Sequence, residues 1–214
     1  MAHPDDPELA CGGTVAKWAK KDTISYIIVS SGEKGTRSKY VSPFMIAKKR
    51  EDEAKKSARF LGVKKIIFLR HPDGLVGSSE SLALELATLM RHIKPHTIVT
   101  HDLWYRQFHP DHRATAAAVI TAIMITRDWH FYPFLSEIGL RPHRPKQLLM
   151  TPTDKPTLVS DITDTFKKKI EAIAIHKSQL KQLPKWKKRI TQRAERDGRI
   201  SNFKYGEGFY QMRI

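Results

Sequence analysis

The chain of 214 residues has a single cysteine, Cys11, and this excludes an intrachain disulfide. The lack of disulfides fits a reducing compartment, and we expect the protein to be cytoplasmic. Long apolar runs are lacking as well, because ATAAAVITAIMIT is too short to cross a membrane and indicates a buried helix. No basic segment followed by an apolar one opens the chain, so we expect no signal peptide.

Acidic residues are scarce relative to basic ones. The chain contains 22 Asp and Glu residues against 38 Lys and Arg residues, which gives a formal net charge of +16. Such a surplus favours an anionic partner, such as nucleic acid, acidic lipid or a phosphorylated small molecule. A lysine-rich solvated surface accounts for the same numbers. The charge alone therefore selects no single class of partner.

The length and composition fit one folded domain. Hydrophobic residues make up 40% of the chain and charged residues 28%, as is typical of globular proteins. A chain of 214 residues is long enough to bury one sizeable core. We expect a single domain over residues 1–214, with a basic, helical C-terminal segment from about residue 163.

Strand and helix patterns alternate over the first 126 residues. Short apolar runs bounded by turn residues predict strands at 24–30, 64–69 and 96–101. Apolar side chains at helical spacing predict helices at 7–20, 43–61, 81–93 and 112–126. This alternation is typical of an α/β fold with a parallel sheet that helices cover on both faces. In such folds the functional site lies at the carboxyl ends of the strands.

Two clusters of histidine and aspartate lie in the loops of this pattern. HPDD occupies residues 3–6, and HPDH occupies residues 109–112 where a helix is predicted to begin. Both segments are expected at the same edge of the sheet, so they can converge. Zinc in hydrolases takes three nitrogen or oxygen ligands and keeps a position for water, and these residue types supply such a set. Solvated loops that cap helices are the alternative explanation.

The motifs resemble those of a known family. AHPDDPELACGGTVAK and HPDHRATA, with SSGEKGT, KKREDEAKKSARFLGV, HKSQ and YGEGF, are similar to the LmbE-like, PIG-L family of zinc-dependent N-acetylglucosamine deacetylases. The resemblance covers nearly the whole chain in the family's order. It implies a Rossmann-like three-layer α/β/α fold with a mostly parallel sheet. It also implies a hydrolase that acts on linear amide C–N bonds.

The resemblance implies a metal site and a general base within the two clusters. His3, Asp6 and His112 correspond to the family's Zn²⁺ ligands, and Asp5 corresponds to its general base. A carboxylate beside a metal-bound water can take the water's proton while the water attacks an acetamide carbonyl. Zn²⁺ lowers the pKa of that water toward neutrality, so a weak base suffices.

Two further residues of the second cluster correspond to catalytic positions of the family. His109 matches the histidine that stabilises the oxyanion developing on the acetamide, and Asp111 matches the carboxylate that orients this histidine. A protonated imidazole held by a carboxylate is a good hydrogen-bond donor to such a charge. The resemblance therefore assigns catalysis to Asp5, His109 and Asp111.

Three residues resemble the family's substrate-binding positions, and each has a structural alternative. Arg50 and Asp73 match positions that hold sugar hydroxyls, and His176 lies in HKSQ. Arg50 can instead form an ion pair with Asp52 or Glu53 of its own helix. HPD at 71–73 is also compatible with a simple turn, and His176 with packing beneath the site.

The chain departs from the family ahead of the first motif. In the family, HPDD follows the first strand of the sheet, whereas only Met1 and Ala2 precede His3 here. We therefore expect a first strand that is truncated, either because the given chain starts late, which is the explanation we favour, or because the sheet lacks a central strand. The second explanation would leave apolar surface and backbone groups without partners. Loss of stability and a looser metal site are the expected consequences.

The leading hypothesis is a zinc-dependent N-deacetylase that removes the acetyl group from a small molecule containing N-acetylglucosamine (GlcNAc). The basic charge favours an anionic aglycone, although the motifs select no particular conjugate. The family's members often associate, so a homo-oligomer is compatible with the sequence. A nucleic-acid-binding module with Trp186 and Phe203 as stacking groups is one alternative. An impaired family member that acts as an interaction subunit is the other.

Overall fold

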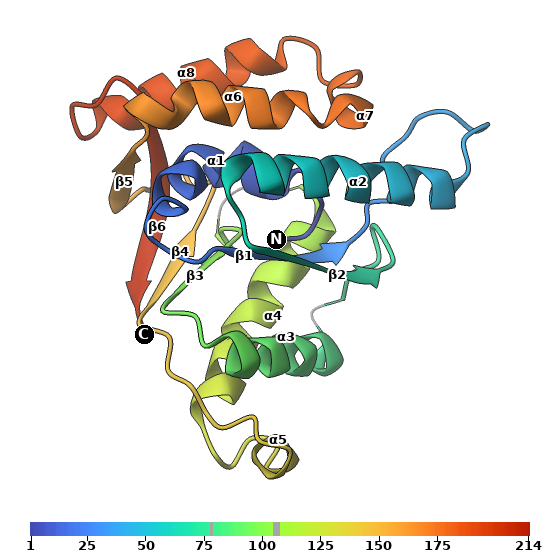
Figure 1. Cartoon of the computed structure of the whole chain (residues 1–214), viewed down its shortest axis with the longest axis vertical. Helices are drawn as coiled ribbons and strands as arrows, with labels where there is room; N and C mark the ends of the chain where they lie inside the picture. Colours follow the sequence, from blue (N-terminus) through green and yellow to red (C-terminus); the bar gives the residue numbers. More distant parts are fainter. Residues whose placement is uncertain (78, 105–107) are drawn as a thin grey trace.

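The computed structural model describes residues 1–77, 79–104 and 108–214, and its strands form two neighbouring sheets (Figure 1). In the first sheet, β1 (Ser25–Ser30) pairs in parallel with β2 (Lys65–His71). The second has the strand order β3–β4–β6–β5, with the bounds Thr97–Thr100, Gln147–Met150, Gly206–Arg213 and Leu158–Asp161. β3 and β4 are parallel, whereas β6 is antiparallel to both β4 and β5.

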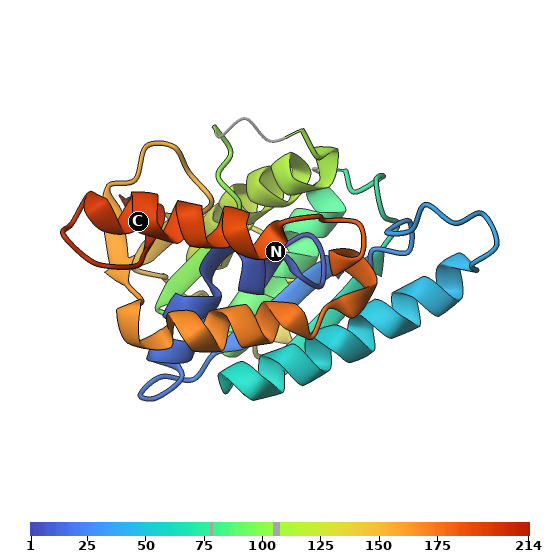
Figure 2. The same cartoon turned by 90° about the horizontal axis from the view of Figure 1, so that it is seen from above.

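Helices cover both faces of the sheets, and Figure 2 shows α6 and α8 stacked over α1. The first face carries α1 (Asp6–Trp18), α2 (Pro43–Leu61), η1 (Thr163–Thr165), α6 (Phe166–Ala174), α7 (Lys177–Leu180) and α8 (Trp186–Arg199). The other face carries α3 (Glu80–Ile93) and α4 (Pro110–Arg127), with α5 (Phe134–Glu137) beyond them. These layers confirm the predicted α/β class and the elements predicted up to residue 126. No helix of the described residues is long and apolar enough to cross a bilayer.

The core forms because each helix turns one apolar face toward the sheets. In α3, Leu82, Leu86 and Met90 recur every fourth residue and are buried together with Ala122 of α4. A second apolar cluster lies between the sheets and α1, α2 and α6, and Leu61 and Phe209 are fully buried there. The two clusters fix the helices on opposite faces and so position the loops at the strand ends.

After the helices between residues 163 and 199, the chain ends in a strand. β6 inserts between β4 and β5 and runs antiparallel to them. Its sequence, GEGFYQMR, contains two glycines, which are unfavourable in strands, so the pattern gave no strand signal here. Only the neighbouring strands make this segment extended.

The amino terminus lies between the carboxyl ends of β1 and β3. The N–H of Val29 donates to the carbonyl of Met1 at 3.1 Å, and the N–H of Ser30 donates to Ala2 at 2.8 Å. The N–H of Ala2 donates to Nε2 of His101, which directly follows β3, at 2.9 Å. Met1 and Ala2 therefore continue the ladder from β1 and deliver the HPDD motif to the sheet edge. No strand of the described residues joins the two sheets.

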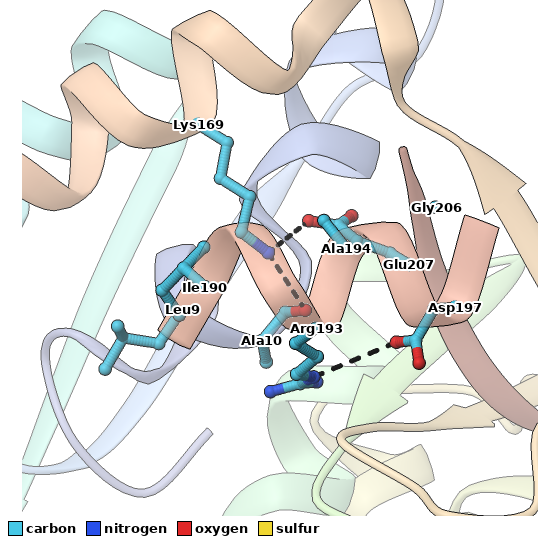
Figure 3. Close-up of a pocket in the computed structure, with 9 residues that line it drawn as sticks. All are labelled: Leu9, Ala10, Lys169, Ile190, Arg193, Ala194, Asp197, Gly206 and Glu207. Atoms are coloured by element: carbon cyan, nitrogen blue, oxygen red, sulfur yellow. Dashed lines mark hydrogen bonds and ion pairs between the residues drawn. The ribbon is translucent and has the colours of Figure 1, made fainter. Parts of the chain in front are cut away.

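A buried ion pair ties β6 to α1 and α6 (Figure 3). Nζ of Lys169 lies 2.5 Å from Oε1 of Glu207 and 3.4 Å from the carbonyl of Ala10. The same carboxylate accepts the N–H groups of Gly13 at 2.9 Å and Thr14 at 2.7 Å. Both charged side chains are almost fully buried. The pair therefore fixes α1, and with it the motif that precedes α1.

Replacing Lys169 should destabilise the fold strongly. Lys169→Met leaves Glu207 buried without its countercharge, and we expect a loss of about 3 kcal/mol in the free energy of unfolding. Lys167→Met is the matched control, because Lys167 faces solvent on the same helix and pairs with Glu171 at 4.0 Å. We expect this control to cost less than about 0.5 kcal/mol. Urea unfolding measures both values, and equal losses would contradict the role of the buried pair.

Candidate functional site

Four loops bring histidines and aspartates to one edge of the sheets. HPDD leads into α1, Asp73 lies two residues after β2, His101 directly follows β3, and HPDH opens α4. His109 is the N-cap of α4, and its Nδ1 accepts the N–H of Asp111 at 3.3 Å. The two clusters predicted to converge at the carboxyl ends of the strands therefore do so.

Three atoms of these clusters form a nearly equilateral triangle. Nδ1 of His3 lies 3.2 Å from Oδ2 of Asp6 and 3.2 Å from Nε2 of His112. The third edge, from Nε2 of His112 to Oδ2 of Asp6, is 3.3 Å. Tetrahedral zinc bonds of about 2.0–2.1 Å hold neighbouring ligand atoms roughly 3.3 Å apart. The spacing and chemistry of this donor set therefore fit zinc.

His101 offers a further nitrogen beside the triangle. Its Nε2 lies 3.3 Å from Oδ2 of Asp6, so Asp6, His101 and His112 also form a group close enough to hold a metal. However, the same Nε2 accepts the N–H of Ala2 at 2.9 Å, which occupies its lone pair. His101 also stacks on His112, with ring centroids 4.0 Å apart. These contacts suit a residue that positions the ligands.

The site concentrates negative charge around His3. Burial opposes a charge on this imidazole, but contacts with Asp111, Asp6 and Asp73 outweigh it and raise the pKa of His3 to about 11. Burial likewise opposes the charge of Asp6, yet His112 and His101 hold the pKa of Asp6 well below its ordinary value. Carboxylates that remain ionised in a buried site favour a bound cation. The electrostatics therefore agree with the donor geometry.

Asp5 lies beside the triangle and is held by Arg50. Nη2 of Arg50 donates to Oδ1 of Asp5 at 2.7 Å, and Nη1 donates to the carbonyl of Gly32 at 2.9 Å. Glu53, one of the alternative partners of Arg50, instead accepts bonds from Ser178 at the start of α7. The guanidinium thus links α2 to the HPDD motif and leaves Oδ2 of Asp5 to act as an acceptor.

The carboxylate of Asp111 lies closer to His3 than to His109. Its Oδ2 is 3.2 Å from Nε2 of His3 and 4.0 Å from Nδ1 of His109. The N–H groups of Gly74 and Val76 donate to this carboxylate at 2.7 and 3.2 Å. Burial, and then the neighbouring histidines, lower the pKa of His109. In this structure, Asp111 orients His3 through its carboxylate and His109 through its backbone.

The two remaining residues predicted to bind substrate, Asp73 and His176, lie in different parts of the structure. Oδ1 of Asp73 lies 3.3 Å from Nε2 of His3, and the hydrogen bond and charge of His3 outweigh burial and lower the pKa of Asp73 to about 2. His176 lies between α6 and α7, and its Nε2 is 3.3 Å from Oε2 of Glu8 in α1. Both members of that pair are buried. The structure therefore brings Asp73 into the cluster and leaves His176 paired with Glu8 outside it.

Sequence reasoning missed His101 and the partner of His176. His101 carried one signal, because it ends a predicted strand at the edge where α/β sites form. Glu8 carried none, since an acidic residue in the first turn of a helix is common for its dipole alone. The stacking groups of the alternative nucleic-acid hypothesis, Trp186 and Phe203, are half-buried.

Known proteins similar to this chain include several deacetylases. Residues 1–123 match the family described as PIG-L: GlcNAc-PI de-N-acetylase. Diacetylchitobiose deacetylase of Thermococcus kodakarensis is 30% identical over 96% of this chain and 79% of that protein. 1D-myo-inositol 2-acetamido-2-deoxy-alpha-D-glucopyranoside deacetylase of Actinosynnema mirum is 24% identical over 84% of this chain and 78% of its own length.

The solved structure of N,N'-diacetylchitobiose deacetylase from Pyrococcus horikoshii, in complex with its inhibitor MPG, has the same fold. Its TM-score against this chain is 0.95 at 31% sequence identity, over 99% of this chain and 81% of that one. This likeness confirms the predicted Rossmann-like α/β class. Together, the motifs, the site and the comparisons show that the chain belongs to the PIG-L family.

Proposed function

We propose that the protein is a zinc-dependent N-deacetylase, which hydrolyses the acetamide of a GlcNAc-containing small molecule. The observation that carries this proposal is the triangle of His3, Asp6 and His112, with edges of 3.2–3.3 Å, beside the carboxylate of Asp5. The names of the related proteins support the substrate class, since they describe deacetylases of acetylated amino sugars.

The chemistry divides between the metal ligands and Asp5. Zinc would supply a Lewis acid and lower the pKa of a water at the site. Asp5 takes a proton from the water that attacks the acetamide carbon, while Arg50 fixes the orientation of this carboxylate. The C–N bond then breaks, and the proton held by Asp5 passes to the leaving amine. One amide and one water thus give the amine and acetic acid, which ionises to acetate and a proton.

His109 would stabilise the negative charge that develops on the acetamide oxygen. In place of the protonated ring expected from the sequence, its lowered pKa favours the neutral imidazole, which has one N–H group. Because Nδ1 accepts the N–H of Asp111, the ring proton belongs on Nε2. Nε2 is therefore the donor that we assign to the oxyanion. Asp111 contributes by fixing both His109 and His3.

Substrate binding involves the residues around this centre. We propose that Arg50 and Asp73 meet sugar hydroxyls, since both lie against the catalytic cluster. The bond between Arg50 and Asp5 links that contact to the general base. Binding by His176 stays a prediction, because its buried pair with Glu8 instead connects α1 to the junction of α6 and α7. An anionic aglycone would match the net charge of +16.

Acetate release provides the direct test. The purified protein is incubated with N-acetylglucosamine, di-N-acetylchitobiose and a GlcNAc conjugate with an anionic aglycone, before and after chelation and with zinc restored. We expect hydrolysis that chelation abolishes and zinc restores. Activity that survives complete metal removal would overturn the metal-dependent reaction. Zinc-loaded protein that hydrolyses none of the three substrates would overturn the GlcNAc assignment.

Gly32 should be required for the position of Arg50. Gly32 has φ +66°, and a Cβ there would lie 2.0 Å from Nη1 of Arg50. Gly139→Ala is the matched control, because Gly139 has φ +87° but no neighbouring atom within 4 Å. We expect each variant to lose about 1 kcal/mol of stability through backbone strain.

Only Gly32→Ala should also lose activity, by about tenfold or more, because the guanidinium must leave Asp5. Thermal unfolding and acetate release measure the two effects separately. If both variants retained the same activity, the link from Gly32 through Arg50 to Asp5 would have no catalytic role.

A further inference from the structure

A segment between β1 and α2 carries four neighbouring apolar side chains on the surface. Tyr40, Val41, Phe44 and Met45 are 86%, 39%, 73% and 57% exposed. We call residues 37–49, which include these side chains, the projecting tip. Figure 1 and Figure 2 both show this segment reaching past the rest of the molecule where α2 begins. Large apolar side chains that gather on a surface mark a contact with another molecule or with a membrane.

Every ionised side chain of the projecting tip is positive. Its exposed basic residues are Arg37, Lys39, Lys48 and Lys49. The chain has no aspartate or glutamate from residue 34 to residue 50. Nζ of Lys39 lies 5.2 Å from the centre of the Tyr40 ring, so positive charge and apolar surface lie side by side. The tip therefore combines the two properties that attract proteins to anionic, partly apolar surfaces.

The base of the projecting tip is fixed to the body of the protein. The carbonyl of Gly35 accepts the side-chain N–H groups of Gln179 at 3.0 Å and of Gln182 at 2.9 Å. On the other side of the tip, Ile46 in the first turns of α2 is buried. Both ends are thus held, and the apolar side chains between them are directed away from the body.

Other kinds of partner fit the projecting tip less well. A second copy of the tip has the same positive charge and would be repelled. Nucleic acid matches the charge, and its bases stack on aromatic rings, but Val41 and Met45 have no ring and would stay in water. The surface of an anionic bilayer has phosphates for the basic groups and acyl chains for aliphatic and aromatic side chains alike.

We propose that the projecting tip docks on the surface of an anionic lipid bilayer. Tyr40, Val41, Phe44 and Met45 enter the boundary between headgroups and acyl chains. The basic side chains stay at the level of the headgroups, where they meet the lipid phosphates. The attraction falls off within a Debye length, so salt weakens it. The contact is peripheral and reversible.

Binding to vesicles tests the apolar part of the contact. Flotation measures the partition constant on vesicles of equal parts phosphatidylglycerol and phosphatidylcholine, and on vesicles of phosphatidylcholine alone. Tyr40→Ser/Phe44→Ser removes the two most exposed rings of the tip. Trp129→Ser/Ile138→Ser is the matched control, because these side chains are 58% and 66% exposed beside α5, outside the tip. Urea midpoints establish that both double variants remain folded.

Two triple variants of equal net charge test the electrostatic part. Lys39→Gln/Lys48→Gln/Lys49→Gln removes positive charge from the tip. The control, Lys20→Gln/Lys64→Gln/Lys65→Gln, removes the same charge from exposed positions near the amino end of β2. Since the two proteins have the same net charge, a difference between them reports the position of the lysines and not their number.

We expect the parent chain to bind the vesicles with phosphatidylglycerol and not those of phosphatidylcholine alone, and to bind less at high salt. Each tip variant should have a partition constant about tenfold or more below that of its control. Equal losses in a tip variant and its control, equal binding to the two kinds of vesicle, or no binding to either would overturn the proposal.

Sedimentation velocity without lipid excludes the competing explanation. If the tip variants dissociated an oligomer of the parent chain and bound vesicles as the parent does, the tip would be an interface between copies, and the proposal would be wrong. We expect both tip variants to sediment as the parent does. Because all the readouts are binding and association, the result is independent of the deacetylase proposal.

Discussion

Asp5→Asn should retain bound zinc and lose most of its turnover, with kcat about 10²–10⁴-fold lower. The amide keeps the size of the carboxylate and can still accept the bond from Arg50, which is 2.7 Å long in the parent protein. It cannot take a proton from the attacking water. Since Asp5 is not part of the ligand triangle, metal content should stay near that of the parent.

Kinetics of acetate release and metal analysis of the same samples check this result. Asp52→Asn provides the baseline, because Asp52 is an exposed carboxylate of α2 whose ion pair within the described part of the chain is with Lys55, at 3.8 Å. Asp5→Asn with activity near that of Asp52→Asn would remove Asp5 from the role of general base. Loss of zinc together with activity would instead make Asp5 a contributor to the metal site.

His112→Ala should lose stoichiometric zinc and, with it, detectable acetate release. The substitution removes Nε2, which lies 3.2 Å from Nδ1 of His3 and 3.3 Å from Oδ2 of Asp6. Two ligands remain, whereas a catalytic zinc site normally has three from the protein. The loss of ligands therefore acts directly on the cofactor.

Two controls identify the ligand set. His130→Ala removes an exposed histidine and should keep both zinc and activity. His101→Gln tests the alternative group with Asp6, and we expect it to keep zinc, because Nε2 of His101 is engaged by Ala2. Zinc bound at full occupancy in His112→Ala would contradict the ligand assignment. Zinc lost in His101→Gln but kept in His3→Ala would favour the alternative group.

The sequence predicted most of the elements that carry the site. Apolar periodicity located β1 to β3 and α1 to α4, because the burial of one helix face or of a short strand is written into local spacing. β6 was not predicted, because GEGFYQMR has two glycines and becomes extended only between β4 and β5. The two-sheet arrangement also depends on contacts between distant segments.

The sequence also supplied the residue types of the site, and the family resemblance supplied their expected roles. It did not supply the contacts of Arg50, whose ordinary partners lie on its own helix, nor those of Asp111, which reaches His3 from another loop. Such pairings depend on where separate loops meet. Local spacing has no information about them.

By itself, the sequence determined that an α/β chain would place two clusters of histidine and aspartate at one sheet edge. Only the tertiary structure decided that His3, Asp6 and His112 form a triangle with edges of 3.2–3.3 Å. The physical reason is the distance along the chain over which each signal acts. Periodicity reports burial within one element, whereas ligand spacing and sheet edges arise where segments about a hundred residues apart pack together.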